Sequence, residues 1–137
     1  MFNTELNLRI DWSELDVANH VNNVMFMKYV QAARVNYWEK MGLYQDFLKT
    51  NNGPMLAHTE CQYKHPLFYP GSVVIKTKVV FVKNTSFGFS HHIYNHEGTL
   101  CAEANDVMVL YNFNAGEKIQ IEDRWRAKIN EIEQKEF

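Results

Sequence analysis

The stretch that decides the fold covers residues 22–42, NNVMFMKYVQAARVNYWEKMG, and holds no proline and no glycine before its last residue. A mostly apolar set recurs at helical spacing: Val24, Met27, Val30, Ala33, Arg34, Tyr37, Trp38 and Met41, widened by Phe26 and Tyr29. This spacing predicts one long helix, with Asn22 as its N-cap and Gly42 in the left-handed position that ends a helix. Because the helix is apolar around much of its surface, we expect it to lie at the centre of the molecule, enclosed by a sheet.

Alternating apolar and polar residues on both sides of this helix predict strands. Before it, the apolar residues of 6–12 fall at every second position, which is typical of an extended segment with one buried face. After a loop that contains residues 51–54, four further strand-like segments lie near 55–65, 72–83, 86–95 and 99–112. Residues 122–134 or so predict a final amphipathic helix. The order indicates an α+β fold in which an antiparallel sheet wraps around the 22–42 helix.

Composition favours one soluble globular domain over residues 1–137, with 46% hydrophobic residues and a net charge of −2. A chain of this length can bury a core without a disulfide or a metal. The near-balanced charge gives no sign of nucleic-acid binding, and the longest apolar runs are too short to cross a bilayer. Cys61 and Cys101 lie far apart, which favours thiols in a reducing, cytoplasmic setting, although two cysteines can still pair.

The polar turn between the first strand and the helix, residues 10–23, is where chemistry is expected. It reads IDWSELDVANHVNN. The scattered glycines form neither GxGxxG nor GxxxxGK, and neither GxSxG nor HExxH occurs, so the remaining chemistry would use carboxylates, histidines or backbone amides. His91 and His92 are adjacent in a strand and point to opposite faces, so we expect no metal site there.

Residues 10–23 resemble the signature of hotdog-fold acyl-CoA thioesterases of the 4-hydroxybenzoyl-CoA thioesterase type. That signature has an aromatic residue, two acidic residues and Gly-His-Val-Asn-Asn, followed by a helix with Tyr and Ala-Arg. The matching residues here are Trp12, Glu14, Asp16, His20, Val21, Asn22, Asn23, Tyr29, Ala33 and Arg34. The resemblance covers about residues 3–115, since the segments 63–71 and 83–86 also look like the family's. Asn19 stands where relatives have Gly, Phe26 where Tyr is frequent, and Gln31 where Glu is frequent.

The resemblance implies a hotdog fold and the hydrolysis of an acyl-CoA thioester without a metal or nucleotide cofactor, coenzyme A being part of the substrate. Asp16 would act as general base toward water or as nucleophile. The backbone N–H of Asn23, at the positive end of the helix, would stabilise the oxyanion. His20 would orient Asp16 or the water. Without the resemblance, Asp16 and His20 equally suit structural roles in a turn before a helix.

Other residues are expected to contact the substrate. On the helix and on the strand after the loop, Tyr29, His58 and Thr59 would line the acyl pocket, although simple packing suits them as well. The turn made of Lys83, Asn84, Thr85 and Ser86 offers a cation, hydroxyls and turn amides to a CoA phosphate or to pantetheine. Its other interpretation is a solvated hairpin turn.

Two alternatives to hydrolysis stay open. The first is a non-catalytic acyl- or acyl-CoA-binding module on the same fold, which the departures at Gln31 and Phe26 leave open, and the second is a hotdog dehydratase. The expected partners are an acyl-CoA or acyl-carrier-protein thioester and further copies of the chain, as a homodimer or homotetramer. A single open sheet leaves unpaired edges, and the resemblance implies that two sheets join edge to edge with sites at the junction.

Overall fold

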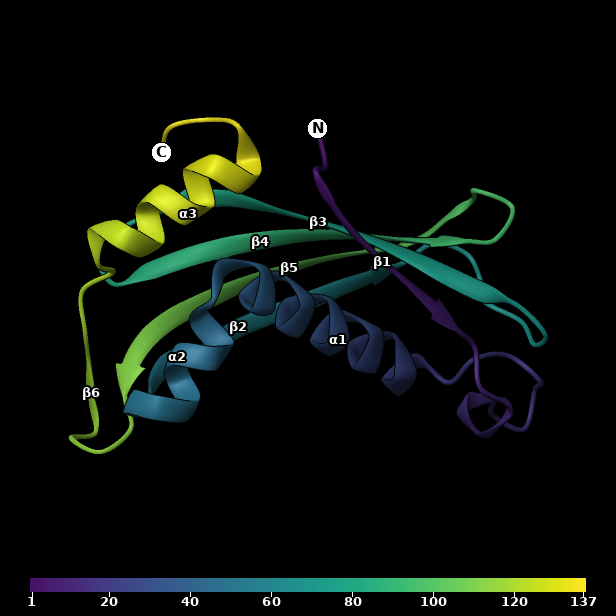
Figure 1. Cartoon of the computed structure of the whole chain (residues 1–137). Coiled ribbons are helices and arrows are strands. Elements are labelled where there is room, and N and C mark those ends of the chain that lie inside the picture. Colours follow the sequence, from purple (N-terminus) through teal and green to yellow (C-terminus); the bar gives the residue numbers. More distant parts are fainter.

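The long helix α1 (Asn23–Met41) lies against the concave side of a curled sheet in the computed structural model, which describes residues 1–137 (Figure 1). In chain order the elements around it are β1 (Thr4–Arg9), the 3-10 turn η1 (Trp12–Glu14), α2 (Leu43–Thr50), β2 (Asn52–Tyr63), β3 (Ser72–Val82), β4 (Ser86–Asn95), β5 (Leu100–Asn112), β6 (Glu117–Lys118) and α3 (Asp123–Glu133).

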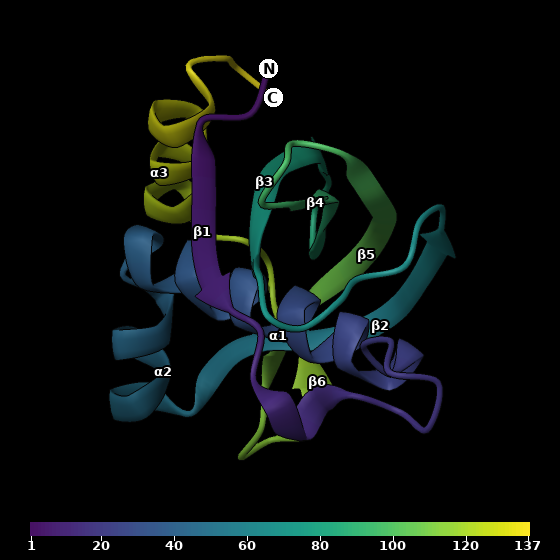
Figure 2. The ribbon, with the colours of Figure 1, turned by 90° about the vertical axis from the view of Figure 1, so that its right-hand side faces the viewer.

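The sheet is antiparallel throughout, with strand order β1-β3-β4-β5-β2, and the short β6 pairs with β5. Its strands curl around α1, which is clearest when the ribbon is seen from the side (Figure 2). This arrangement confirms the predicted α+β hotdog architecture. The strands β1 and β2 are the two edges of the sheet.

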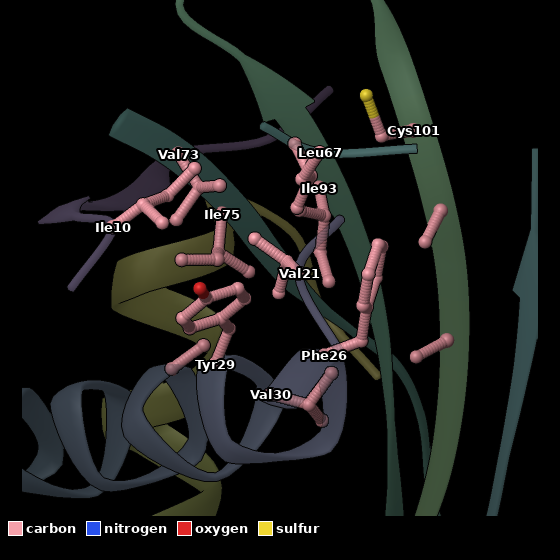
Figure 3. Packing of buried hydrophobic residues seen from close by; sticks show 13 residues of the cluster. Ile10, Val21, Phe26, Tyr29, Val30, Leu67, Val73, Ile75, Ile93 and Cys101 are labelled. Atoms are coloured by element: carbon pink, nitrogen blue, oxygen red, sulfur yellow. The ribbon is translucent and has the colours of Figure 1, made fainter. Parts of the chain in front are cut away.

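Both ends of α1 follow the signals in the sequence. The Asn22 side chain accepts a hydrogen bond from the Val24 amide over 3.0 Å, and Gly42 adopts a left-handed φ of 82°. Between these ends, the apolar face of α1 packs on the sheet, and Figure 3 shows Phe26, Tyr29 and Val30 pointing from the helix toward side chains of the strands. The helix is therefore the centre of the core, as its pattern predicts.

The sequence interpretation differs from the structure between residues 43 and 54. The pattern predicts no element over residues 43–50, which form α2 directly after Gly42, because eight residues give too few turns for a helical period to stand out. It also placed residues 51–54 in a loop, whereas β2 already begins at Asn52. Pro54 fits in β2 because this is an edge strand, where a residue without an N–H is tolerated.

The two cysteines are free thiols, with Cys61 on β2 half-buried and Cys101 on β5 buried. The preference for thiols over a disulfide is thus confirmed. None of the helices combines the length and the apolar character that crossing a membrane requires.

The polar turn is held against the segment that joins β2 to β3. The Ile10 amide donates to the Gly71 carbonyl and the Val21 amide donates to the Leu67 carbonyl, each over 2.9 Å. An isolated β-bridge also pairs His20 with the segment, at Phe68. These contacts fix the turn at the N-terminal end of α1, where the candidate site lies.

Candidate active site

The tip of the polar turn is a tight hairpin that carries Asp16. Leu15 pairs with Val21 in an isolated bridge, and the Asp16 amide donates to the His20 carbonyl over 2.8 Å. Asn19 has a φ of 62°, at the position where relatives of the expected type have glycine. Asparagine tolerates this left-handed conformation better than most residues, so the departure from the signature leaves the turn intact.

Asp16 is exposed, and only one of its carboxylate oxygens is bound within the protein. Its Oδ1 accepts hydrogen bonds from the Ala18 amide over 2.8 Å and from the His20 amide over 3.3 Å. These bonds orient the carboxylate across the turn. The other oxygen, Oδ2, accepts no hydrogen bond from the protein, and this leaves it available to a water molecule or a substrate.

The start of α1 includes a backbone amide without an acceptor in the protein. The Val24 amide is taken by the Asn22 side chain and the Met25 amide by the Asn22 carbonyl. The amide of Asn23, the first residue of the helix, has no acceptor in the protein, as expected where a helix begins. The helix dipole makes this N–H a favourable donor to an oxyanion.

A pocket of about 330 Å³ brings these groups together. Its lining combines the polar turn and the first turn of α1 with the residues that follow β2: Asp16, His20, Val21, Asn23, Phe26, Tyr63, Lys64, His65 and Pro66. The three predicted catalytic residues, Asp16, His20 and Asn23, therefore share one pocket. The residues 63–66 were noted in the sequence only as a weak match to the family, and their part in the pocket depends on long-range packing.

His20 is half-buried in this pocket, and its ring is held by an aromatic contact. The ring meets Phe68 edge-on, with ring centroids 5.1 Å apart and an interplanar angle of 86°. No side chain of the protein forms a hydrogen bond with the ring nitrogens. The imidazole can therefore serve a bound water or substrate.

Tyr29 does not line the pocket. Its side chain is 1% exposed, and its hydroxyl donates to the Glu14 carboxylate over 2.8 Å. Burial and the neighbouring Glu14 raise the pKa of Tyr29 well above its usual range. Tyr29, which the sequence suggested as a substrate contact, is therefore a buried residue of the core in the structure.

His58 and Thr59 lie on β2 away from the pocket and point to opposite faces of the strand. His58 is exposed, beside Glu60 at 3.7 Å. Thr59 faces α1 and donates to the Asp106 carboxylate over 2.7 Å. Only Thr59 can therefore line a space between β2 and α1.

Thr59 is part of a buried polar network that the sequence did not reveal. Asp106 on β5 accepts hydrogen bonds from Arg34 Nε over 2.8 Å and from His91 Nε2 over 2.6 Å. The hydroxyl of Thr77 lies 2.9 Å from His91 Nδ1, so the imidazole donates to Asp106 and accepts from the hydroxyl. The network links α1 to the middle of the sheet.

His91 and His92 point to opposite faces of β4, as the strand pattern predicts. His91 is buried in the network, while His92 lies on the other face, 3.6 Å from Glu103. Nowhere in the chain do three or more His, Cys, Asp or Glu side chains gather in a way that would hold a metal ion.

The turn 83–86 lies at the opposite end of the sheet from the pocket. It joins β3 to β4 beside α3, as Figure 1 shows, and Arg126 of α3 donates to the Lys83 carbonyl over 2.6 Å. The Leu110 amide donates to the Thr85 carbonyl over 2.9 Å. Within one copy of the chain, the predicted CoA-binding residues and the predicted catalytic residues are therefore separated by the length of β3.

A curled antiparallel sheet around one helix, with a pocket at the start of that helix, defines the hotdog class of proteins. The sequence profile of the Thioesterase-like superfamily matches residues 10–129, and the chain belongs to this superfamily. The motif's likeness to the 4-hydroxybenzoyl-CoA type is a finer assignment, which this match leaves as a prediction.

Similar proteins come from several bacteria. The uncharacterized protein YsmA of Bacillus subtilis (strain 168) is 25% identical over 114 residues, which cover 83% of this chain and 76% of that protein. The solved structure of a predicted thioesterase from Bacillus stearothermophilus is 26% identical, with a TM-score of 0.83 and 93% of each chain covered. A thioesterase from Thermus thermophilus, complexed with coenzyme A and Zn, is 20% identical, with a TM-score of 0.88 and coverage of 99% of this chain and 98% of that one.

Proposed function

We propose that the protein hydrolyses acyl-CoA thioesters to a free acid and coenzyme A. One observation carries the proposal: a single pocket is lined by Asp16, whose Oδ2 accepts no hydrogen bond from the protein, and by Asn23, whose amide has no acceptor in the protein. An acyl transfer reaction needs both a base or nucleophile and a donor to the developing oxyanion. Membership of the Thioesterase-like superfamily supports this chemistry.

In the general-base route, Asp16 takes one proton from a water molecule while the water oxygen bonds to the thioester carbonyl carbon. The carbonyl oxygen becomes negative and accepts a hydrogen bond from the Asn23 amide, a contact typically worth about 3 kcal/mol of barrier. When the intermediate collapses, the carbon–sulfur bond breaks and the CoA thiolate takes the proton from Asp16. His20 would hold the water in line.

In the nucleophilic route, an oxygen of Asp16 attacks the carbonyl carbon directly. The CoA thiolate leaves with the electrons of the carbon–sulfur bond, and a mixed anhydride remains on Asp16. Water then hydrolyses this anhydride to regenerate the carboxylate and release the acid. In ¹⁸O water, ¹⁸O found in Asp16 after a single turnover identifies the nucleophilic route, because the label enters this carboxylate only when water attacks the aspartyl carbon of an anhydride.

The CoA part of the substrate would be held by a second copy of the chain. The edge strand β2 exposes apolar side chains, among them Met55, Leu56 and Tyr63. If two copies pair antiparallel through β2, the Asn52 end of one strand meets the Tyr63 end of the other. The partner copy's turn 83–86 then comes to the same end of the joined sheet as Asp16, so Lys83 and Ser86 would serve the neighbouring site.

The test is release of free thiol from a panel of acyl-CoAs of varied length, both aromatic and aliphatic, with an acyl-carrier-protein thioester alongside. Hydrolysis of at least one substrate above the buffer rate, lost in Asp16→Asn, is the expected result.

Phe26 lines the pocket without the hydroxyl of the frequent tyrosine, which favours a binding module as the second candidate. Tight acyl-CoA binding without thiol release would establish that module, and hydration of an enoyl-CoA would identify a dehydratase. We also propose a cytoplasmic location, because both cysteines are free thiols.

A further inference from the structure

Glu14 is a buried carboxylate at the base of the polar turn, two residues before Asp16. It is 4% exposed, although glutamate is rarely buried unless its charge is paired. The pocket does not include it. Its burial therefore needs an explanation apart from direct contact with the substrate.

Both oxygens of Glu14 are occupied by partners from two different elements. Oε1 accepts from the Asp11 amide and from the Tyr29 hydroxyl, each over 2.8 Å. Oε2 lies 2.8 Å from Lys28 Nζ, whose side chain is largely exposed. Burial alone would raise the pKa of Glu14, but the hydrogen bonds from Lys28, Asp11 and Tyr29 outweigh it and lower the pKa. Each oxygen of this carboxylate thus already has a hydrogen-bond partner, and the lowered pKa makes Glu14 a weak base.

The backbone of Glu14 also contacts the end of the polar turn that leads into α1. Its carbonyl accepts from the Asn22 amide over 2.8 Å. Asn22 immediately precedes Asn23, which offers the free amide, and Asp16 follows Glu14 by two residues. Glu14 is therefore the residue that ties both arms of the turn to the second turn of α1.

We propose that Glu14, held by Tyr29, is a positioning residue that fixes the Asp16 carboxylate relative to the Asn23 amide. This inference rests on the proposed function, because it assigns Glu14 a task in the reaction of Asp16. Loss of the Tyr29 hydroxyl frees one side of the Glu14 carboxylate, and the turn then moves relative to the helix. A shift of about 1 Å at a reacting group can cost about a hundredfold in rate.

The fold supplies a matched control at the other end of α1. The Tyr37 hydroxyl donates to the Glu133 carboxylate over 2.5 Å, and Tyr37 is as fully buried as Tyr29. Tyr29→Phe and Tyr37→Phe therefore remove the same kind of hydrogen bond from the same helix. Only the first of these bonds touches the polar turn.

The experiment measures kcat, KM and the melting temperature of Tyr29→Phe, Tyr37→Phe, Glu14→Gln and Glu14→Ala with the best acyl-CoA. Glu14→Ala is expected to lower kcat by about 10- to 100-fold and Tyr29→Phe by about 3- to 10-fold, with KM nearly unchanged, because positioning acts on the reacting geometry. Tyr37→Phe is expected to lower the melting temperature as much as Tyr29→Phe does while kcat stays at the wild-type value. If Glu14→Ala does not fold, Tyr29→Phe and Glu14→Gln carry the test.

A double-mutant cycle separates positioning from general loss of structure. In the Asp16→Asn background, Glu14→Gln is expected to leave the residual turnover unchanged within about twofold, since residues that act as one unit are not additive. Equal kcat losses in Tyr29→Phe and Tyr37→Phe, an effect carried by KM, or full additivity with Asp16→Asn would overturn the inference while the proposed function stands. A wild-type protein without thiol release would instead end the proposed function.

Discussion

At the scale of the residue, Asp16 combines a satisfied oxygen with a free one. Oδ1 accepts hydrogen bonds from two amides of the turn, while Oδ2 accepts none from the protein, and the residue lines the pocket. Asn in this position keeps a carbonyl oxygen for both amides but can neither take a proton from water at neutral pH nor attack a thioester. The chemical role of Asp16 can therefore be removed without removing its structural one.

Asp16→Asn is expected to lower turnover by about 100- to 10,000-fold, the usual range of general-base catalysis. The free energy of unfolding should change by at most about 1 kcal/mol, the scale of a turn or cap contact. Acyl-CoA affinity should stay near the wild-type value or tighten, because a negative charge beside the thioester is lost. Thiol release, urea denaturation and an acyl-CoA binding titration of the purified variant measure these three quantities.

Turnover above about a tenth of the wild-type rate would exclude Asp16 as the catalyst. His20 would then be the next candidate, because its ring nitrogens are free in the same pocket. Glu14, the other acid of the motif, has both oxygens engaged.

At the scale of the element, the network around Asp106 joins α1 to β4 and β5 and links their packing to pH. Burial lowers the pKa of His91, so the folded protein holds this imidazole neutral. Burial alone would raise the pKa of Asp106, but hydrogen bonds from His91 and Arg34 outweigh it and hold that pKa well below its usual range. Both groups bind fewer protons in the folded state than in the unfolded state at the same acidic pH.

The lowered pKa values of His91 and Asp106 make the stability of the protein depend on pH. A group whose pKa is lower when folded contributes stability that is present above its unfolded pKa and is lost as the pH falls. For His91 the loss begins near the ordinary value of 6.5, and for Asp106 it begins near 3.8. The free energy of unfolding should therefore fall as the pH drops from about 7 to about 5, mainly through His91.

His91→Gln is expected to flatten this fall, since the variant has no imidazole to protonate, although its stability at neutral pH will be lower. Urea denaturation at a series of pH values measures the slope. His58→Gln, at an exposed position on β2, is the matched control and should keep the wild-type slope. If the free energy of unfolding of His91→Gln falls with pH as steeply as that of the wild type, His91 is not the source of the pH dependence.

At the scale of the whole molecule, one copy of the chain leaves β2 unpaired along one side of its 12 residues. Long unpaired edges with apolar side chains favour association with another strand. We expect a homodimer as the smallest unit, joined through β2, with a tetramer as the further assembly that closed symmetry allows. Light scattering at micromolar protein should give at least twice the mass of the 16.2 kDa chain, and a monomeric mass would contradict the proposed pairing.

The same pairing predicts how Lys83 acts. Lys83→Ala should raise KM for acyl-CoA by about two- to fivefold, the scale of one exposed charge contact, and leave turnover of a short pantetheine thioester nearly unchanged. The reason is that only the nucleotide end of CoA loses a cation. Lys128→Ala on α3 serves as the control, and equal losses on both substrates for Lys83→Ala would give this lysine a structural role.

The sequence by itself determined the features that depend on local pattern. The length and caps of α1 follow from residues 22–42, and the alternation along the strands predicts an antiparallel sheet around that helix. The resemblance of residues 10–23 to the hotdog thioesterase signature likewise pointed to the candidate catalytic turn with Asp16, His20 and Asn23, because the whole motif lies within one short stretch of chain. The sequence pattern does not predict the short helix α2, because its eight residues hold too few turns to show a helical period.

Only the tertiary structure decided which distant residues meet. It brought residues 63–66 to the pocket, buried the Tyr29 hydroxyl against Glu14, and joined Arg34 to Asp106 across 72 positions of sequence. It also separated the turn 83–86 from Asp16 by the length of a strand. Such pairings arise because buried polar and charged groups need hydrogen-bond partners. A periodic pattern along one helix or strand does not show which other element will supply the partner.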